Sequence, residues 1–206
     1  SNNDSGGTGG SDSTSANTLL GYLAGDDIAD GGVNNAFVGH AAGHKNTTGD
    51  NNSGFGRYAG FGNLTGDNNT FVGSNAGLSD NGSSHSNNTG VGFEALKALT
   101  TGDDNVAIGS SALLNITSGE RNVAIGRQAG LSTTSANRNT AVGYQALYNE
   151  NADGDRTVAI GYQALYSQDG DTETMGNSGF GYNSGFYNVT GTLNTWVGYQ
   201  AGTGAS

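Results

Sequence analysis

The sequence of 206 residues contains no cysteine and no proline. Without cysteine the chain forms no disulfide bonds and has no thiolate to act as a nucleophile or metal ligand. Its 38 glycines, without proline and without a strict three-residue period, exclude a collagen-like triple helix. No run of about eighteen apolar residues occurs, so we expect no membrane-spanning helix.

Positive charge is also scarce, because seven Lys and Arg residues stand against eighteen Asp and Glu, for a formal net charge of −11. Nucleic-acid binding requires clusters of Lys and Arg that contact phosphates, so we expect no nucleic-acid partner. The same charge disfavours binding to an anionic membrane surface. No signal peptide is visible and the chain does not begin with Met, which fits a processed secreted protein or an excised fragment. We expect an extracellular, cell-surface or virion-fibre location.

Residues suited to catalysis are few. His40 and His44 share one repeat with Asp50, but two histidines four residues apart in a glycine-rich loop are a weak zinc pattern. We interpret both histidines as surface residues. No Gly-x-Ser-x-Gly motif is present, and most acidic residues lie in turns, where Asp is usually structural. We therefore predict that the chain is not an enzyme and needs no cofactor.

What the sequence does contain is a repeat of about seventeen residues. Asn-Val-Ala-Ile-Gly stands at 105–109 and 122–126, and Asn-Thr-Ala-Val-Gly at 139–143. A fixed period of this size is typical of a solenoid, in which each repeat is one coil stacked on the last. The short β-branched runs indicate strands rather than helices. The central glycine recurs eleven times, at Gly21, Gly39, Gly56, Gly73, Gly92, Gly109, Gly126, Gly143, Gly161, Gly181 and Gly198.

We therefore predict an all-β fold, a parallel β-solenoid of about eleven coils over residues 17–206, preceded by a Gly/Ser/Asp-rich leader at 1–16. Four residues before the glycine stands Asn in ten coils and Thr157 in one. Stacked coils place equal positions about 4.8 Å apart, so these amides can hydrogen-bond along the stack. We predict a structural Asn ladder of Asn17, Asn35, Asn52, Asn69, Asn88, Asn105, Asn122, Asn139, Asn177 and Asn194.

Two apolar columns precede the glycine. We expect the residue directly before it to fill the coil interior, with the Ala three positions after it and an apolar residue five after it (Phe61, Leu78, Leu114, Leu131, Tyr148, Tyr166, Phe186). The column two before the glycine then points outward, because neighbours in a strand face opposite sides. An apolar outward column favours self-association. The interface candidates are Leu19, Phe37, Phe71, Ala107, Ala124, Ala141, Ala159 and Trp196. Reversed faces, or a wider coil that encloses both columns, are the alternatives.

Other positions carry weaker patterns. Acidic turns can bind calcium, and the candidates are Asp103, Asp104, Asp153 and Asp155, although the strict calcium repeat is absent. Candidate glycosylation sites are Asn46, Asn63, Asn115 and Asn188. A ladder of Tyr144, Tyr162, Tyr182 and Tyr199 either packs along the sheet, which we favour, or binds glycans by stacking.

The motif Asn-Val-Ala-Ile-Gly, completed by an Ala after two variable residues, resembles the head repeats of trimeric autotransporter adhesins. The segment Thr-Ala-Val-Gly-Tyr-Gln-Ala-Leu at 140–147 is similar to repeats of phage tail-fibre-like proteins. The resemblance covers residues 17–202 and implies left-handed parallel β-rolls, three of which pack about a threefold axis. The repeat here is somewhat longer than the usual adhesin head repeat.

These patterns favour a non-enzymatic extracellular fibre protein, structural or adhesive, whose partners are further copies of itself and a host-surface glycan or protein. We expect a homotrimer or an end-to-end filament, since the chain stops at 202–206 without a polar cap and an uncapped coil favours stacking. The alternatives are a flat-faced ice or glycan binder, for which Thr18, Thr70, Thr89, Thr140 and Thr195 share one column, and a polysaccharide-cleaving tailspike.

Overall fold

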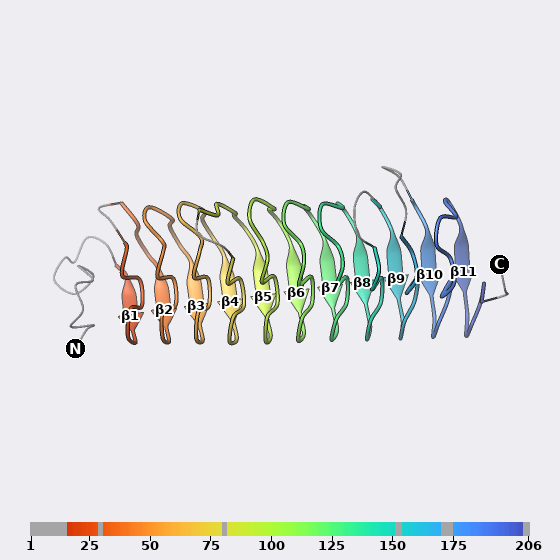
Figure 1. The fold of residues 1–206 in the computed structure, drawn as a ribbon, viewed down its shortest axis with the longest axis horizontal. Coiled ribbons are helices and arrows are strands. Elements are labelled where there is room, and N and C mark those ends of the chain that lie inside the picture. Colours follow the sequence, from red (N-terminus) through yellow and green to blue (C-terminus); the bar gives the residue numbers. More distant parts are fainter. Residues whose placement is uncertain (1–15, 29–30, 80–81, 151–153, 170–174, 204–206) are drawn as a thin grey trace.

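The computed structural model describes residues 16–28, 31–79, 82–150, 154–169 and 175–203. They form one sheet of eleven parallel strands whose spatial order equals their sequence order. Figure 1 shows the strands side by side in a row, with the N-terminal coil at one end and the C-terminal coil at the other. The strands are β1 (Thr18–Leu20), β2 (Ala36–Val38), β3 (Ser53–Phe55), β4 (Thr70–Val72), β5 (Thr89–Val91), β6 (Val106–Ile108), β7 (Val123–Ile125), β8 (Thr140–Val142), β9 (Val158–Ile160), β10 (Ser178–Phe180) and β11 (Thr195–Val197).

The register keeps equal repeat positions in contact. Val106 pairs with Val123, Ala107 with Ala124 and Ile108 with Ile125, and the other neighbouring strands pair in the same way. The predicted all-β parallel solenoid is thus confirmed, and the described residues contain no helix. Eleven strands at the usual spacing make a rod of roughly 50 Å. Most of the expected leader, residues 1–15, lies outside the described residues.

The central glycine forms the corner at which each strand ends. Gly109 has a φ of 134°, a value that L-residues with a side chain rarely adopt. A Cβ at Gly109 would lie 2.5 Å from the carbonyl oxygen of Gly126 in the next coil. The glycine column therefore has two causes, the backbone conformation of the corner and the close approach of the neighbouring corner.

The assignment of the two strand faces in the sequence analysis was wrong. Phe37, Ala107 and Ala124, two positions before the glycine, are at most 2% exposed, whereas Ile108 and Ile125, directly before it, are 40% and 39% exposed. The reason is strand alternation, since the buried Asn four before the glycine puts the residue two before it on the same side. The interface candidates Leu19, Phe37, Phe71, Ala107, Ala124, Ala141, Ala159 and Trp196 all pack in the interior of the coils.

Inside the coils, a large residue on the strand is matched by glycine four positions after the corner. A Cβ on Gly43 would lie 2.4 Å from an atom of the Phe37 ring, and one on Gly77 would lie 2.5 Å from the Phe71 ring. Where the strand carries Ala107, the position four after the corner is instead the buried Leu113. Most coils thus hold one large side chain, supplied from one of two positions, as close packing requires.

A third interior column lies seven positions after the corner. It contains the fully buried Leu99, Ile116, Glu150 and Gln168 and the nearly buried Thr133. The column five after the corner, which we had expected in the core, is only half-buried and lies along the outside of the coils, as Leu114 and Leu131 show. The interior therefore contains polar as well as apolar side chains, and each buried polar group requires a partner.

Candidate functional site

The Asn ladder is continuous from Asn17 to Thr157. In each step the side-chain Oδ1 of one coil accepts the backbone N–H of the equivalent residue in the next, as from Asn122 N to Asn105 Oδ1 at 3.0 Å. The side-chain amide also contacts the next coil, because Asn105 Nδ2 donates to Gly119 O at 2.8 Å. The side chains of Asn88 and Asn105 are completely buried. The ladder therefore joins consecutive coils and satisfies buried backbone groups at the start of each strand.

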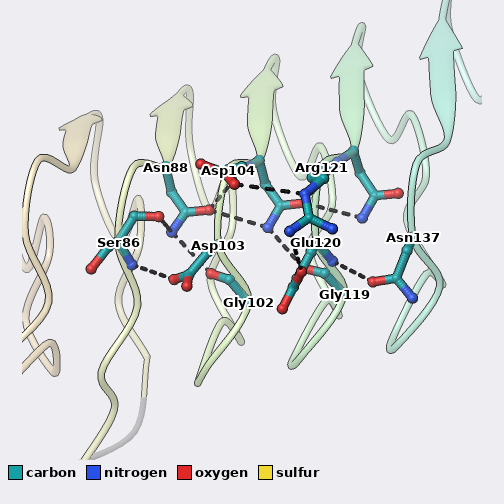
Figure 2. A network of polar contacts seen from close by, with 11 residues as sticks. Ser86, Asn88, Gly102, Asp103, Asp104, Gly119, Glu120, Arg121 and Asn137 are labelled. Atoms are coloured by element: carbon teal, nitrogen blue, oxygen red, sulfur yellow. Dashed lines mark hydrogen bonds and ion pairs between the residues drawn. The ribbon is translucent and has the colours of Figure 1, made fainter.

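A second ladder, which the sequence analysis missed, lies two positions before the Asn ladder. Here a backbone N–H of one coil donates to a side chain of the following coil, so that Ser86 N donates to Asp103 Oδ1 at 2.6 Å and Glu120 N donates to Asn137 Oδ1 at 2.8 Å. Figure 2 shows the two ladders side by side. The signal for it was hidden because Asp, Ser and Asn all serve as the acceptor at this position.

Three of the four calcium candidates lie in or beside this second ladder. Asp155 Oδ1 accepts from Asn137 N at 2.6 Å, and its Oδ2 lies 3.4 Å from Arg138 Nη1. Asp104 Oδ2 lies 3.8 Å from Arg121 Nε (Figure 2). We therefore interpret Asp103 and Asp155 as structural acceptors. Asp153 lies outside the described residues, which contain no group of three or more His, Asp or Glu arranged to hold a metal ion.

The glycosylation candidates fall into two groups. Asn46 and Asn63 are 1% and 3% exposed, and Asn63 Nδ2 donates to Gly66 O at 2.9 Å. Their side chains belong to the third interior column, so a glycan on either one would require the coil to open, and the expectation for these two is wrong. Asn188 is half-buried and donates to Gly191 O, whereas Asn115 is exposed.

The Asn ladder is interrupted at Thr157, where a different network replaces it. Gln168 Nε2 donates to Thr157 Oγ1 and to Glu150 Oε2, both at 2.8 Å, and Gln168 Oε1 accepts from Asn177 Nδ2 at 2.9 Å. Glu150 is fully buried. Desolvation by burial, assisted by the nearby charges of Asp169 and Asp155, raises the pKa of Glu150 from its ordinary value of 4.5 to about 7.

This pKa makes the stability dependent on pH. The folded state binds a proton at Glu150 that the unfolded state releases between pH 4.5 and 7, so the free energy of unfolding falls as pH rises through this window. We expect the free energy of unfolding of the wild type to fall by about 3 kcal/mol relative to that of Glu150→Gln, with most of the change between pH 5 and 7.5. Denaturant unfolding of both proteins at several pH values measures it, and parallel stability curves would contradict it. Desolvation lowers the pKa of buried His85 to about 4, so His85 changes the free energy of unfolding below pH 6.5. This contribution is the same in both proteins and cancels in the comparison.

The outward side of the sheet is uncharged along its whole length, and its column directly before the corner is apolar in every coil. We call it the apolar face; it consists of the residues one and three positions before each central glycine on β1 to β11. Phe55, Ile108, Ile125, Ile160 and Phe180 on this face are between 38% and 43% exposed. None of its twenty-two positions carries a charge. Contiguous exposed apolar surface of this kind usually marks a contact with another molecule.

Charged and polar residues border the apolar face on both sides. Asp104, Arg121 and Arg138 precede the Asn ladder on one side, and Arg127 follows the corner on the other. An apolar centre with a polar rim is the usual anatomy of a protein–protein interface.

Two aromatic ladders follow the corner in the C-terminal half. Tyr144, Tyr162, Tyr182 and Tyr199 stack with ring centroids 5.0 to 5.2 Å apart and interplanar angles of 6° to 19°. Tyr148, Tyr166 and Phe186 form the second ladder, at 4.9 and 5.0 Å. Because the ring faces cover one another, only the ring edges of the inner members remain for a sugar, and we interpret the ladders as packing between coils.

Two further observations bear on identity. The described part of the chain has no helix with the length and apolarity that a bilayer crossing requires. Comparison of the chain with models of protein families, with curated proteins and with solved structures gives no match.

Proposed function

We propose that this chain is a non-enzymatic structural subunit of an extracellular fibre, which associates with further copies of itself through the apolar face. The observation that carries the proposal is the uncharged column directly before the corner, which continues over all eleven strands and whose isoleucines are about 40% exposed. The self-association predicted in the sequence analysis is retained, but on the opposite side of the strand.

A second copy fits this face better than an unrelated partner. The residues on it repeat with the spacing of the strands, so an equally long partner with the same period can match every coil. Another copy of the chain offers the same apolar centre and the same rim. The net charge of −11 opposes association in general, but the absence of charge on the face keeps repulsive groups out of the contact.

The test is the mass of the particle in solution. We expect light scattering and native mass spectrometry to give a discrete multiple of the chain mass of 20.6 kDa, with three chains as the multiple that the resemblance to adhesin heads implies. The double variant Ile108→Asp, Ile125→Asp places charges in the centre of the contact, and we expect it to become monomeric while its circular dichroism stays that of the wild type.

The matched control is Leu114→Asp, Leu131→Asp, which adds the same charges to the same two coils on the half-buried outer column five after the corner. The control should keep the mass of the wild type. A wild-type chain that remains a monomer at micromolar concentration would overturn the proposal, and so would an equal loss of mass in both variants.

An ice-binding face is the second candidate, because the Thr column that motivated it does lie on the apolar face. Thr70 and Thr89 stand on adjacent strands in register. The column is interrupted by Val106, Val123 and Val158, which offer no hydroxyl to ordered water. A monomeric chain with thermal hysteresis activity would favour this candidate over the fibre subunit.

A further inference from the structure

We propose that the corner of coils two to four holds a binding site for an acidic sugar, a pyranose that carries a carboxylate. The site would give the proposed fibre subunit an adhesive role, and it rests on the proposed function only in that respect. A cavity of about 550 Å³ opens there, lined among others by His40, His44, Arg57, Tyr58, Phe61 and Asn75. This volume is in the range of small-molecule sites and admits one or two sugar rings.

The cavity exists because the repeat changes locally. Tyr58 stands two positions after its corner, while its equivalents in the neighbouring coils are the smaller Ala41 and Asn75. The ring of Tyr58 therefore has no aromatic neighbour at the same position, in contrast to the continuous ladders of the C-terminal half. The short side chains on both sides of it leave the space that forms the cavity.

The rings at this corner are set edge to face. Tyr58 meets His40 at 5.2 Å and 87°, and it meets Phe61 at 5.4 Å and 90°. Phe61 is also stacked on His44, with ring centroids 5.3 Å apart and an interplanar angle of 30°, so these rings form one aromatic wall of the cavity. The apolar C–H face of a pyranose can pack against an aromatic wall of this kind.

Arg57 supplies the positive charge. Its guanidinium carbon lies 4.5 Å from the centre of the Tyr58 ring, which holds the group beside the cavity. Arg57 makes no ion pair within the described residues, although the chain carries eighteen acidic residues. A planar guanidinium pairs with a carboxylate through two parallel hydrogen bonds.

Asp26 and Asp27 face His44 and Lys45, and neither forms an ion pair with Arg57. Asp27 Oδ2 lies 2.9 Å from Lys45 Nζ, and Asp26 Oδ2 lies 4.0 Å from His44 Nε2. Neither Asp lines the cavity. His44 Nδ1 lies 3.9 Å from Asp27 Oδ2, beyond hydrogen-bond distance, and has no hydrogen-bond partner in the described structure, so a sugar hydroxyl can supply one.

Ligand-observed NMR titration of the full chain tests the site, with methyl glucuronide as probe and methyl glucoside and acetate as comparisons. We expect saturable binding of the glucuronide, with at least tenfold weaker binding of the other two. Arg57→Gln should weaken glucuronide binding at least tenfold. Arg127→Gln is the matched control, because Arg127 holds the same repeat position and lies 5.8 Å from the Tyr144 ring, but it lines no part of this cavity.

A second pair of variants tests the aromatic wall. Phe61→Leu should weaken binding severalfold, whereas Phe186→Leu, at the same repeat position in a stacked ladder, should leave it unchanged. Equal binding of glucuronide and glucoside, equal binding of acetate, or no saturation by the glucuronide would each overturn the inference. The outcome is independent of the fibre proposal, because an oligomer without binding overturns only the site and a binding monomer overturns only the self-association.

Discussion

Gly109→Ala is expected to destabilise the solenoid by more than 4 kcal/mol, a loss that is exceptional for one methyl group. The φ of 134° at Gly109 imposes roughly 1 to 3 kcal/mol of backbone strain on alanine. The new Cβ would also lie 2.5 Å from Gly126 O, so the two corners would have to separate. Separation stretches the hydrogen bonds from Gly126 N to Ile108 O and from Gln128 N to Ser110 O, which are 2.7 and 2.9 Å long.

Gly198→Ala is the matched control, because it separates strain from contact. Gly198 has a φ of 123°, but a Cβ there meets no atom within 4 Å. We expect this variant to be destabilised only by the backbone strain, which costs about 1 to 3 kcal/mol. Guanidinium unfolding followed by circular dichroism, at one protein concentration for all variants, gives both values. Equal losses in the two variants would show that corner contact contributes nothing to the glycine column.

Asn105→Ala is expected to cost roughly 2 to 5 kcal/mol, because it leaves buried polar groups without partners. Asn105 is fully buried and forms four hydrogen bonds through its side chain, two as acceptor from Asn122 and two as donor to Asn88 and Gly119. After truncation, Asn122 N–H and Gly119 O lose their partners in the interior. Hydrogen exchange should then increase first at Asn122 and its neighbours in β7.

Asn115→Ala serves as the control for this variant. Asn115 is an Asn in the same coil, but its side chain is exposed and has no hydrogen bond within the described structure. Its loss should change the free energy of unfolding by at most about 0.5 kcal/mol. If Asn105→Ala were as mild as Asn115→Ala, the ladder would be a consequence of the stacking and not a cause of it.

The Asn ladder and the strands could be predicted because equal positions of consecutive repeats contact each other. Identical residues at a spacing of 17 residues can therefore be read directly as neighbours in space. Asn105 and Asn122 were placed together on this ground, and the structure joins them by hydrogen bonds. The second ladder escaped notice because the side chains of Asp50, Ser86 and Asn137, which differ in type, all accept the backbone N–H of the preceding coil.

The face of each strand could not be deduced from hydropathy, because Ala107 and Ile108 are both apolar. The buried position of Asn105 would have decided the question, since residues two apart in a strand share a side. Glycine at position 43 opposite Phe37, and at position 77 opposite Phe71, carried the same information in the form of complementary volumes. Phe37 and Gly43 belong to one repeat, but their contact follows only from the way the coil closes.

By itself the sequence determined the repeat, the eleven strands, their parallel order and the Asn ladder. The reason is that residues at equal positions of consecutive repeats contact each other once the chain stacks on itself. Only the tertiary structure decided which column points inward and where a cavity opens. The direction of a column depends on the closure of the coil through Gly109 and its equivalents. The cavity beside Arg57 and Tyr58 depends on small residues of two neighbouring coils that meet only after folding.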